Sequence, residues 1–201
     1  FIHIPTTLLA MVDASVGGKN GVDLGHLKNQ IGVINVPKMV LIDSTYLETL
    51  PQNEMRSGLA EMLKHGLIYD ANYWKQFLDL SQLDFADFDT LIYQSIEIKN
   101  NIVMQDPTEN GIRKALNFGH TIGHAIESYR LKHEQPITHG EAVAFGMIAE
   151  TYLSYKTGLI LKDHHEQIQN FLKNICNVSR ISNLNLNEVF DYLQHDKKNE
   201  S

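Results

Sequence analysis

The sequence predicts a mostly α-helical protein whose first part is α/β. Two patterns along its 201 residues carry this prediction. Up to about Pro51, short apolar runs alternate with Gly, Asn and Pro, as in strands joined by turns. After Pro51, apolar residues recur mostly three or four positions apart, the spacing of a helix with one buried face. We therefore expect an α/β segment over residues 1–50 and a helical domain over residues 51–201.

The α/β segment contains short apolar runs that predict strands, namely Phe1–Ile4, Ile31–Val36 and Met39–Ile42. The last run is unbroken and suits a buried strand. Residues 6–16 have the apolar content of a helix, which Gly17 and Gly18 would end. Residues 17–32 hold five Gly, two Lys and two Asn, a composition that predicts a loop. Because the chain opens at Phe1 inside a predicted strand, without Met or a secretion signal, we expect it to be a piece of a longer protein.

The second segment begins with a helix at Pro51, a residue suited to a first helical turn. Its apolar residues are Met55, Leu59, Met62, Leu63 and Leu67. Gly158 is typical of a residue that ends a helix. Further helices are predicted at Ala71–Leu80, Phe88–Met104, Phe118–Tyr129, Glu141–Lys156, Lys162–Asn174 and Leu186–His195.

The composition is that of a soluble globular chain, with 43% apolar and 20% charged residues. The 17 Lys and Arg against 24 Asp and Glu give a net charge of −7, which argues against a nucleic-acid partner or an anionic membrane partner. A single cysteine excludes an internal disulfide and a four-cysteine zinc site, and it favours a reducing compartment. No apolar run approaches the roughly 18 residues of a membrane span.

The strongest local signal is a group of histidines. His120 and His124 are four residues apart, so on a helix both rings lie on one face and can share a metal. Gly119 and Gly123 leave the neighbouring stripe without side-chain bulk, so another helix or a ligand can approach the backbone. His139 stands at the start of a further helix. The alternative is that these histidines are hydrogen-bonded residues of the core or of helix ends.

A catalytic zinc usually takes three protein ligands and keeps one position open, so a carboxylate could complete the set. Glu61 is such a carboxylate, flanked by apolar residues at helical spacing. Its alternative role is that of a surface residue paired with Lys64.

A second signal is Gly17-Gly18-Lys19, which follows Asp13. It offers flexible backbone N–H groups and one cation, a combination suited to phosphate. It is not a Walker motif because Asn20 follows the lysine, and a plain turn is the alternative. Lys99 and Arg113 are further candidate cations, and their alternative is a solvated charge on a helix or loop.

Taken together, these motifs resemble the 3-dehydroquinate synthase family in identity and order. The matching segments are Ile4–Ala10, Asp13–Lys19, Lys28-Asn29, Gly58–Lys64, Arg113–His124, His139–Val143 and Asp196–Lys198. The resemblance implies a helical C-terminal domain preceded by the α/β end of a Rossmann-like NAD-binding domain. It also implies a cytoplasmic lyase of the shikimate pathway, homodimeric when full length. This enzyme converts 3-deoxy-D-arabino-heptulosonate 7-phosphate to 3-dehydroquinate and phosphate, using NAD and Zn²⁺ or Co²⁺.

The resemblance assigns roles position by position. The metal ligands would be Glu61, His120 and His139. The residues in contact with the phosphorylated sugar-acid substrate would be Asp13, Lys19, Asn29, Lys64, Lys99, Arg113, Asn117, His124 and one or both of Lys197 and Lys198. The residues in contact with NAD would be Thr6, Thr7, Lys19, Lys28, Tyr46, Leu47, Glu48 and Thr49. His124 thereby becomes a base rather than a third histidine ligand.

Two alternatives stay open beside this assignment. One is a related sugar-phosphate cyclase or a metal-dependent polyol dehydrogenase, and the other is an inactive metal-binding fragment. The family's glycine-rich turn for the NAD pyrophosphate would lie before Phe1, so we expect the chain alone to bind NAD hardly at all and to be inactive. Up to seven of the 17 basic residues fall in or beside the matching motifs, which favours one cationic cleft in an acidic protein.

Overall fold

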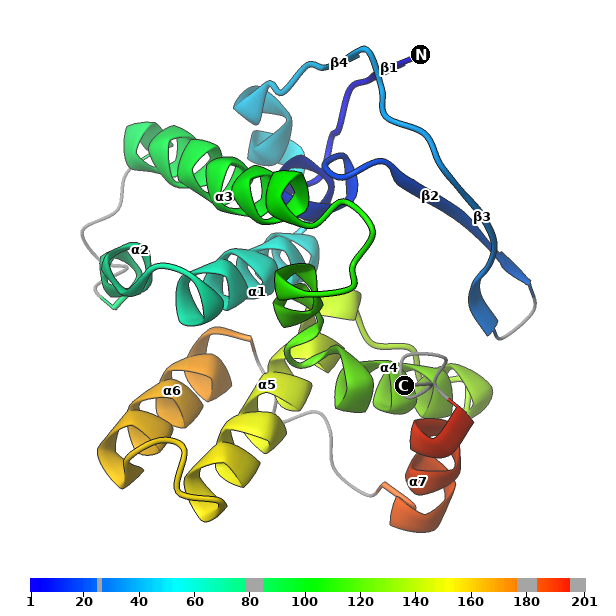
Figure 1. The fold of residues 1–201 in the computed structure, drawn as a ribbon, viewed down its shortest axis with the longest axis vertical. Helices are drawn as coiled ribbons and strands as arrows, with labels where there is room; N and C mark the ends of the chain where they lie inside the picture. The colour runs from blue at the N-terminus through cyan, green and yellow to red at the C-terminus, as the bar shows by residue number, and fades with distance from the viewer. Residues whose placement is uncertain (25–26, 79–84, 177–183, 196–201) are drawn as a thin grey trace. The chain divides into compact units, whose positions relative to one another are not determined.

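The computed structural model describes residues 1–24, 27–78, 85–176 and 184–195. The chain forms two compact units, Phe1–Leu116 and Asn117–Ser201 (Figure 1). The first contains every described strand together with α1 to α3, and the second contains α4 to α7.

The strands of the first unit form two separate pairs. β1 (Ile2–His3) lies parallel to β4 (Met39–Val40), as the apolar runs predict. The prediction that residues 39–42 form a buried strand is wrong, because Met39 is 51% exposed and Leu41 is 52% exposed. Among the described strands, β4 has only β1 beside it.

β2 (Lys19–Leu24) and β3 (Leu27–Ile34) form an antiparallel hairpin, so the loop predicted over residues 17–32 is wrong. Gly21 lies directly opposite Gly32 in this hairpin. A Cβ on Gly32 would come within 3.0 Å of the Asn20 carbonyl oxygen. These glycines, which suggested turns, therefore permit close strand pairing.

Residues between β1 and β2 form a tight helical segment that includes the π-helical turn η1 (Ala10–Ala14). Leu8, Met11 and Val12 are fully buried, which accounts for the apolar content of this stretch. Gly17 and Gly18 end it with φ values of 99° and 69°, a region that glycine enters without steric cost. The predicted helix and its glycine stop are confirmed.

The remaining elements of the first unit are η2 (Ser44–Thr49), α1 (Gln52–Ile68), α2 (Ala71–Gln76), α3 (Phe85–Gln105) and η4 (Ile112–Asn117). α1 contacts α2, α3 and η1. The predicted helices of this unit are confirmed in position, although the one predicted over Ala71–Leu80 ends at Gln76 and residues 79–80 lie outside the described residues. Asp70 caps α2 by accepting from the N–H groups of Asn72 and Tyr73. A Cβ on Gly58 would lie 2.5 Å from Leu8, so α1 packs directly on the segment before η1.

The second unit consists of α4 (His120–Lys132), α5 (His139–Lys156), α6 (Lys162–Ile175) and α7 (Leu186–His195). α4 packs against α5 and α7, and α5 packs against α6. A core cluster of Ala125, Ile126, Tyr129 and Val189 joins α4 to α7. All four helices and the stop at Gly158, whose φ is 78°, agree with the prediction.

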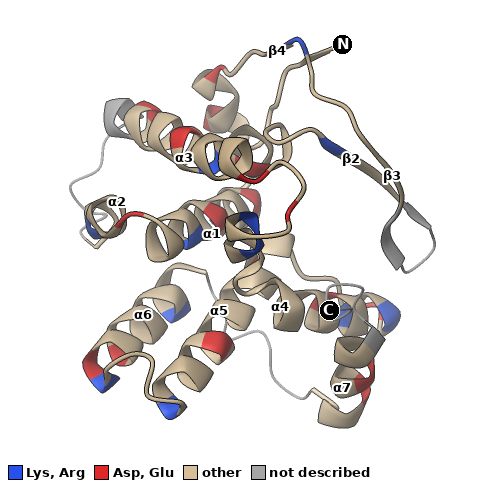
Figure 2. Cartoon of the chain, viewed as in Figure 1, with Lys and Arg blue, Asp and Glu red and all other residues tan. Residues whose placement is uncertain are grey.

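The outer charges of the second unit are ordinary surface charges. Acidic and basic residues are interspersed along α6 (Figure 2), where Lys162 and Glu166 form an exposed ion pair of 3.2 Å. Such pairs contribute little to stability. Within the described part of the chain, no helix combines the length and apolar character needed to cross a bilayer.

Candidate active site

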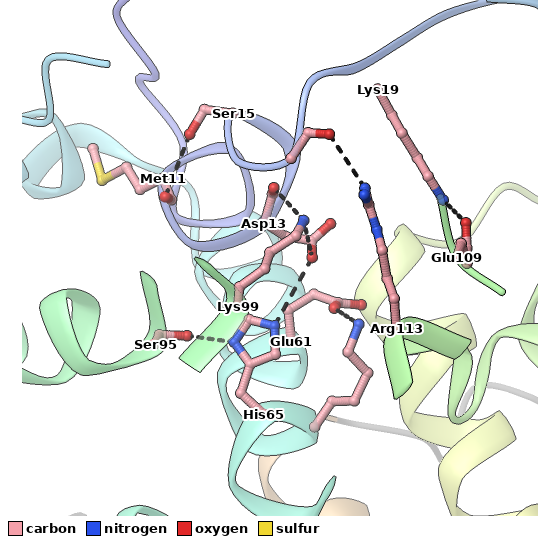
Figure 3. Close-up of polar contacts among 12 residues, drawn as sticks. Met11, Asp13, Ser15, Lys19, Glu61, His65, Ser95, Lys99, Glu109 and Arg113 are labelled. Atoms are coloured by element: carbon pink, nitrogen blue, oxygen red, sulfur yellow. Dashed lines mark hydrogen bonds and ion pairs between the residues drawn. The ribbon is translucent and has the colours of Figure 1, made fainter. Parts of the chain in front are cut away.

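A buried cluster of charged side chains lies in the first unit, where η1, α1 and α3 meet (Figure 3). Asp13 extends from η1, and Lys99 reaches it from α3 with 2.7 Å between Nζ and Oδ1. Nζ of Lys99 also donates to the Asp13 backbone carbonyl. Lys99 is only 7% exposed, so the alternative of a solvated helix charge is wrong.

Burial and charge oppose each other at this pair. Burial alone would raise the pKa of Asp13, but the charges of Lys99 and Lys64 act against it, and the net result is a pKa below the ordinary value. Burial lowers the pKa of Lys99, and the Asp13 carboxylate partly offsets that effect. The arrangement holds one cation in a position that only a compensating anion makes stable.

Glu61 and Lys64 form a second ion pair one turn apart on α1. Their side chains are 0% and 1% exposed, so the alternative of a solvated surface pair is wrong. Glu61 and Lys64 interact electrostatically with Asp13, as Lys99 does. The four side chains form a cluster with two charges of each sign. Groups of this kind can bind and orient polar ligands because few waters compete for them.

His65 is part of the same cluster, although the sequence did not single it out. It is fully buried, its Nδ1 lies 2.7 Å from Oγ of Ser95 on α3, and its Nε2 lies 4.0 Å from Oδ1 of Asp13. Burial, together with the charge of Lys64, lowers the pKa of His65 to about 3, so the imidazole is neutral. No local signal could have identified it, because its role depends on Ser95, 30 residues later.

Arg113 joins the glycine turn to the loop after α3 through two side-chain hydrogen bonds. Its Nη2 donates to the Gly17 carbonyl at 3.2 Å, and its Nη1 donates to the Pro107 carbonyl at 2.9 Å. The side chain is 3% exposed, so Arg113 is not the solvated loop charge of the alternative. A Cβ on Gly17 would lie 2.9 Å from Nη2, which makes glycine a requirement here.

Lys19 is more accessible than the other cations. It is 52% exposed at the start of β2 and pairs with Glu109, a residue that the sequence did not indicate. The Glu109 loop is shaped by Asp106, whose carboxylate accepts hydrogen bonds from the N–H groups of Asn110, Gly111 and Arg113. The Lys19 ammonium is therefore accessible to a ligand, and an anionic ligand could replace Glu109 as its ion-pair partner.

The second unit brings together the three predicted histidines. The ring centroids of His120 and His124 are 5.2 Å apart, those of His120 and His139 are 5.2 Å apart, and those of His124 and His139 are 5.8 Å apart. His120 and His139 are the first residues of α4 and α5, and His124 lies one turn into α4. The clustering favours a shared role, although the contacts of His120 and His139 at their helix starts are also what the alternative of hydrogen-bonded helix-end residues predicts.

Close backbone packing produces this cluster. A Cβ on Gly146 would lie 1.9 Å from the Gly119 carbonyl oxygen, and one on Gly123 would lie 2.9 Å from the Ala142 carbonyl oxygen. The glycine stripe predicted to admit a helix or a ligand therefore admits a helix, α5. The Gly119 N–H donates to Glu150 of α5 at 2.9 Å, which supplies the cap that α4 lacks locally. Burial raises the pKa of Glu150.

The first turn of α5 is fixed by its own cap. Thr138 and Glu141 form a reciprocal capping box around His139. His139 Nδ1 lies 3.5 Å from Oε2 of Glu127 on α4, another residue that sequence reasoning missed. The capping box fixes the start of α5. Glu127 lies beside Nδ1 of His139 and thereby orients the imidazole ring.

The two histidine rings at the helix starts present the same nitrogen. Nδ1 of His120 lies 3.2 Å from the Phe118 carbonyl oxygen, which can only accept, so Nδ1 carries the proton in this contact. The carboxylate beside Nδ1 of His139 favours the same tautomer. Nδ1–H donated to a carbonyl or carboxylate is the usual outer shell of a metal-binding histidine, so this pair fits zinc or cobalt.

The other predicted residues are distributed as follows. Thr6, Tyr46, Glu48 and Thr49 are exposed in the first unit, and Thr7 is partly buried. The Leu47 side chain is 7% exposed and belongs to the core, so only its backbone is available to a ligand. Asn117 is the last residue of η4. The side chains of Lys28 and Asn29, as well as Lys197 and Lys198, lie outside the part of the chain that the structure describes.

Two family models match the chain. The 3-dehydroquinate synthase N-terminal model covers residues 1–57, and the 3-dehydroquinate synthase C-terminal model covers residues 58–199. The chain belongs to the 3-dehydroquinate synthase family. It is 43% identical over 99% of its length to the 3-dehydroquinate synthases of Parabacteroides distasonis and Streptococcus pyogenes serotype M49. It spans 57% and 56% of these two relatives, so it corresponds to little more than half of a 3-dehydroquinate synthase.

Two solved structures share the fold of this chain. A 2-deoxy-scyllo-inosose synthase complexed with carbaglucose-6-phosphate, NAD⁺ and Co²⁺ aligns with a TM-score of 0.85 and 30% identity, over 99% of this chain and 55% of that one. A 2-epi-5-epi-valiolone synthase from Streptomyces hygroscopicus with NAD⁺ and Zn²⁺ bound aligns with a TM-score of 0.84 and 25% identity, over 96% of this chain and 55% of that one.

Proposed function

We propose that the full-length protein is a 3-dehydroquinate synthase. It converts 3-deoxy-D-arabino-heptulosonate 7-phosphate to 3-dehydroquinate and phosphate in the shikimate pathway, acting as a cytoplasmic homodimer. The observation that carries this proposal is 43% identity to 3-dehydroquinate synthases over essentially the whole chain, against 25–30% to cyclases with other names. Residues 1–50 would complete the NAD-binding domain, and residues 51–201 would bind metal and substrate.

The proposed metal ligands are Glu61, His120 and His139. The histidine pair of the second unit supports the assignment, since Nδ1 of each ring lies beside an oxygen partner. Glu61 supports it as a carboxylate held rigidly on α1 by Lys64. Zn²⁺ or Co²⁺, when bound, would polarise a substrate hydroxyl and lower its pKa.

NAD, when bound, would accept a hydride from the substrate and later return it. The proposed contacts are Thr6, Thr7, Lys19, Lys28 and residues 46–49. The exposed hydroxyls and backbone of residues 6 and 46–49 support this assignment, as does the partly exposed cation Lys19. Leu47 can take part only through its backbone because its side chain is buried.

The substrate's phosphate dianion requires cationic side chains. We assign this task to the buried Lys99 and Arg113, to the more exposed Lys19, and to Lys197 or Lys198, with Asn29 as a hydrogen-bond donor. Asp13 would keep Lys99 charged and oriented, while Lys64 would do the same for Glu61 and donate to a substrate oxygen. His124, which is partly buried beside the other two histidines, would transfer a proton, and Asn117 would hold a substrate hydroxyl.

Product analysis of the full-length enzyme tests the proposal. With NAD and Zn²⁺, the heptulosonate phosphate should give 3-dehydroquinate and one phosphate per turnover, with no net NADH. Sedoheptulose 7-phosphate and glycerol should give no product. Turnover of sedoheptulose 7-phosphate would favour another cyclase, and NADH accumulation from glycerol would favour a polyol dehydrogenase. No turnover of any substrate would favour a binding module.

A further inference from the structure

His65 is a buried imidazole with one nitrogen engaged and the other facing a carboxylate (Figure 3). We infer that His65 is a positioning residue for Asp13, and that Ser95 holds it in the tautomer whose Nε2–H is directed at the Asp13 carboxylate. The importance of this role rests on the proposed function, in which Asp13 contacts the substrate. The geometry itself involves only the first unit.

The direction of the Ser95 proton decides the tautomer. Oγ of Ser95 lies 2.7 Å from Nδ1 of His65, and both side chains are fully buried, so water does not compete for this bond. If Nδ1 carried the proton, the lone pair of Nε2 would face the Asp13 carboxylate at 4.0 Å and be repelled by it. If Ser95 donates, the N–H dipole points at the carboxylate and attracts it.

Ser95 engages Nδ1 of His65, so Nε2 is the ring nitrogen that can interact with Asp13. It is buried and has no hydrogen-bond partner within the described residues. A buried unsatisfied N–H is costly, so it favours any small movement that brings it closer to Oδ1 of Asp13. Asp13 is then restrained from two sides, by Lys99 on α3 and by His65 on α1.

The order carboxylate, imidazole, hydroxyl resembles the triad of serine hydrolases, but the chemistry differs. Ser95 is 0% exposed, so no substrate can reach its Oγ. Its hydroxyl acts inward, on the imidazole. The arrangement orients the Asp13 carboxylate, and the Asp13 carboxylate in turn orients the Lys99 ammonium.

Nitrogen NMR of the ¹⁵N-labelled full-length protein tests the tautomer directly. We expect the His65 Nδ1 resonance at the position of an unprotonated nitrogen and the Nε2 resonance at that of a protonated one. In Ser95→Ala the donor is lost, and the signals should shift toward a mixture of tautomers. A protonated Nδ1 in the unchanged chain would overturn the inference, as would a Ser95→Ala spectrum identical to the parent.

Two substitutions test the positioning. The amide nitrogen of Gln can occupy the place of Nε2, whereas the amide of Asn reaches only the place of Nδ1. Because Lys99 is buried and donates to Asp13, we expect it to give a slowly exchanging ammonium signal as long as Asp13 holds it. We expect this signal to persist in His65→Gln and to be lost in His65→Asn, with helical content checked by circular dichroism.

Equal behaviour of the Gln and Asn variants would contradict a positioning role. If both variants fail to fold, the tautomer measurement on the unchanged chain still decides the inference. These measurements need neither metal nor NAD, so failure of the proposed activity in product analysis would leave their outcome unaffected.

Discussion

The Lys99 ammonium lies 2.7 Å from a carboxylate oxygen of Asp13, although 86 residues separate the two along the chain. This pair joins η1 to α3 at the centre of the buried charge cluster. Neither charge would be stable there alone, because burial raises the pKa of the carboxyl and lowers that of the ammonium. The cluster therefore depends on contacts between segments that are distant in sequence.

The first prediction concerns the energy of this pair. Lys99→Met should lower the free energy of unfolding by about 2–4 kcal/mol, somewhat less than for a fully buried pair because the Asp13 side chain is 24% exposed. The double variant with Asp13→Asn should recover much of the loss. Urea denaturation measures both. Lys162→Met, which breaks an exposed pair, should cost only about 0.5 kcal/mol. Strict additivity of the two single changes would contradict a coupled pair.

The second prediction is a pH dependence of the Asp106 loop. Burial raises the pKa of Asp106, but hydrogen bonds from the Gly111, Asn110 and Arg113 N–H groups outweigh it and lower the pKa below 3.8. The ionised form therefore contributes stability above pH 3.8, and this contribution is lost as pH falls through the folded-state pKa. Thermal melts should show Asp106→Asn less stable than the parent at pH 7, with the difference shrinking toward pH 2. A difference independent of pH would contradict this.

The third prediction concerns the contact between α4 and α5. Ala normally stabilises a helix interior relative to Gly by about 1 kcal/mol. Gly146→Ala should instead destabilise the chain, because the new Cβ would lie 1.9 Å from the Gly119 carbonyl oxygen. We expect the free energy of unfolding, measured by denaturant titration, to fall by about 1–3 kcal/mol. We also expect weaker Zn²⁺ binding, measured by metal titration.

Gly158→Ala is the matched control for this steric effect. Its Cβ would meet nothing within 4 Å, but φ is 78°, so only the backbone conformation is strained. It should cost about 1–2 kcal/mol and leave Zn²⁺ affinity unchanged. Equal Zn²⁺ affinity in the two variants would mean that metal binding by the histidine cluster does not depend on the glycine contact, and this would refute the third prediction.

The fourth prediction tests Glu127 as the partner of His139. Glu127→Gln should weaken Co²⁺ and Zn²⁺ binding about 10–100-fold, measured by competition with a chelator, with little change in melting temperature. Glu188→Gln is the matched control, because it removes an equivalent carboxylate from the surface residue His133, at 2.8 Å. Unchanged affinity in Glu127→Gln, or an equal loss in Glu188→Gln, would exclude the orienting role.

Sequence periodicity predicted the helices well because their buried faces repeat along one segment. The first helix after Pro51 and the helix that begins at His139 lie where the apolar spacing and cap residues indicated. The hairpin was missed because Gly21 and Gly32, typical of turns, face each other across strands. Pairing partners of a strand are not encoded in its local pattern.

The sequence allowed the residues of the candidate site to be predicted better than their burial and their interaction partners. The four-residue spacing of His120 and His124 indicated a shared face, and the rings are indeed 5.2 Å apart. Nothing local to Lys99 indicated burial, because its partner comes from η1. His65, Glu127 and Glu150 were missed for the same reason, since each acts on a group in another helix or at its start.

The central claim is that Glu61, His120 and His139 hold one catalytic metal. In the full-length protein, each should be changed to Ala, and bound metal should be quantified by elemental analysis alongside turnover. We expect metal and turnover to be lost together in all three variants. His164→Ala, on the exposed face of α6, should retain both. Normal metal content in the three variants would contradict the ligand assignment.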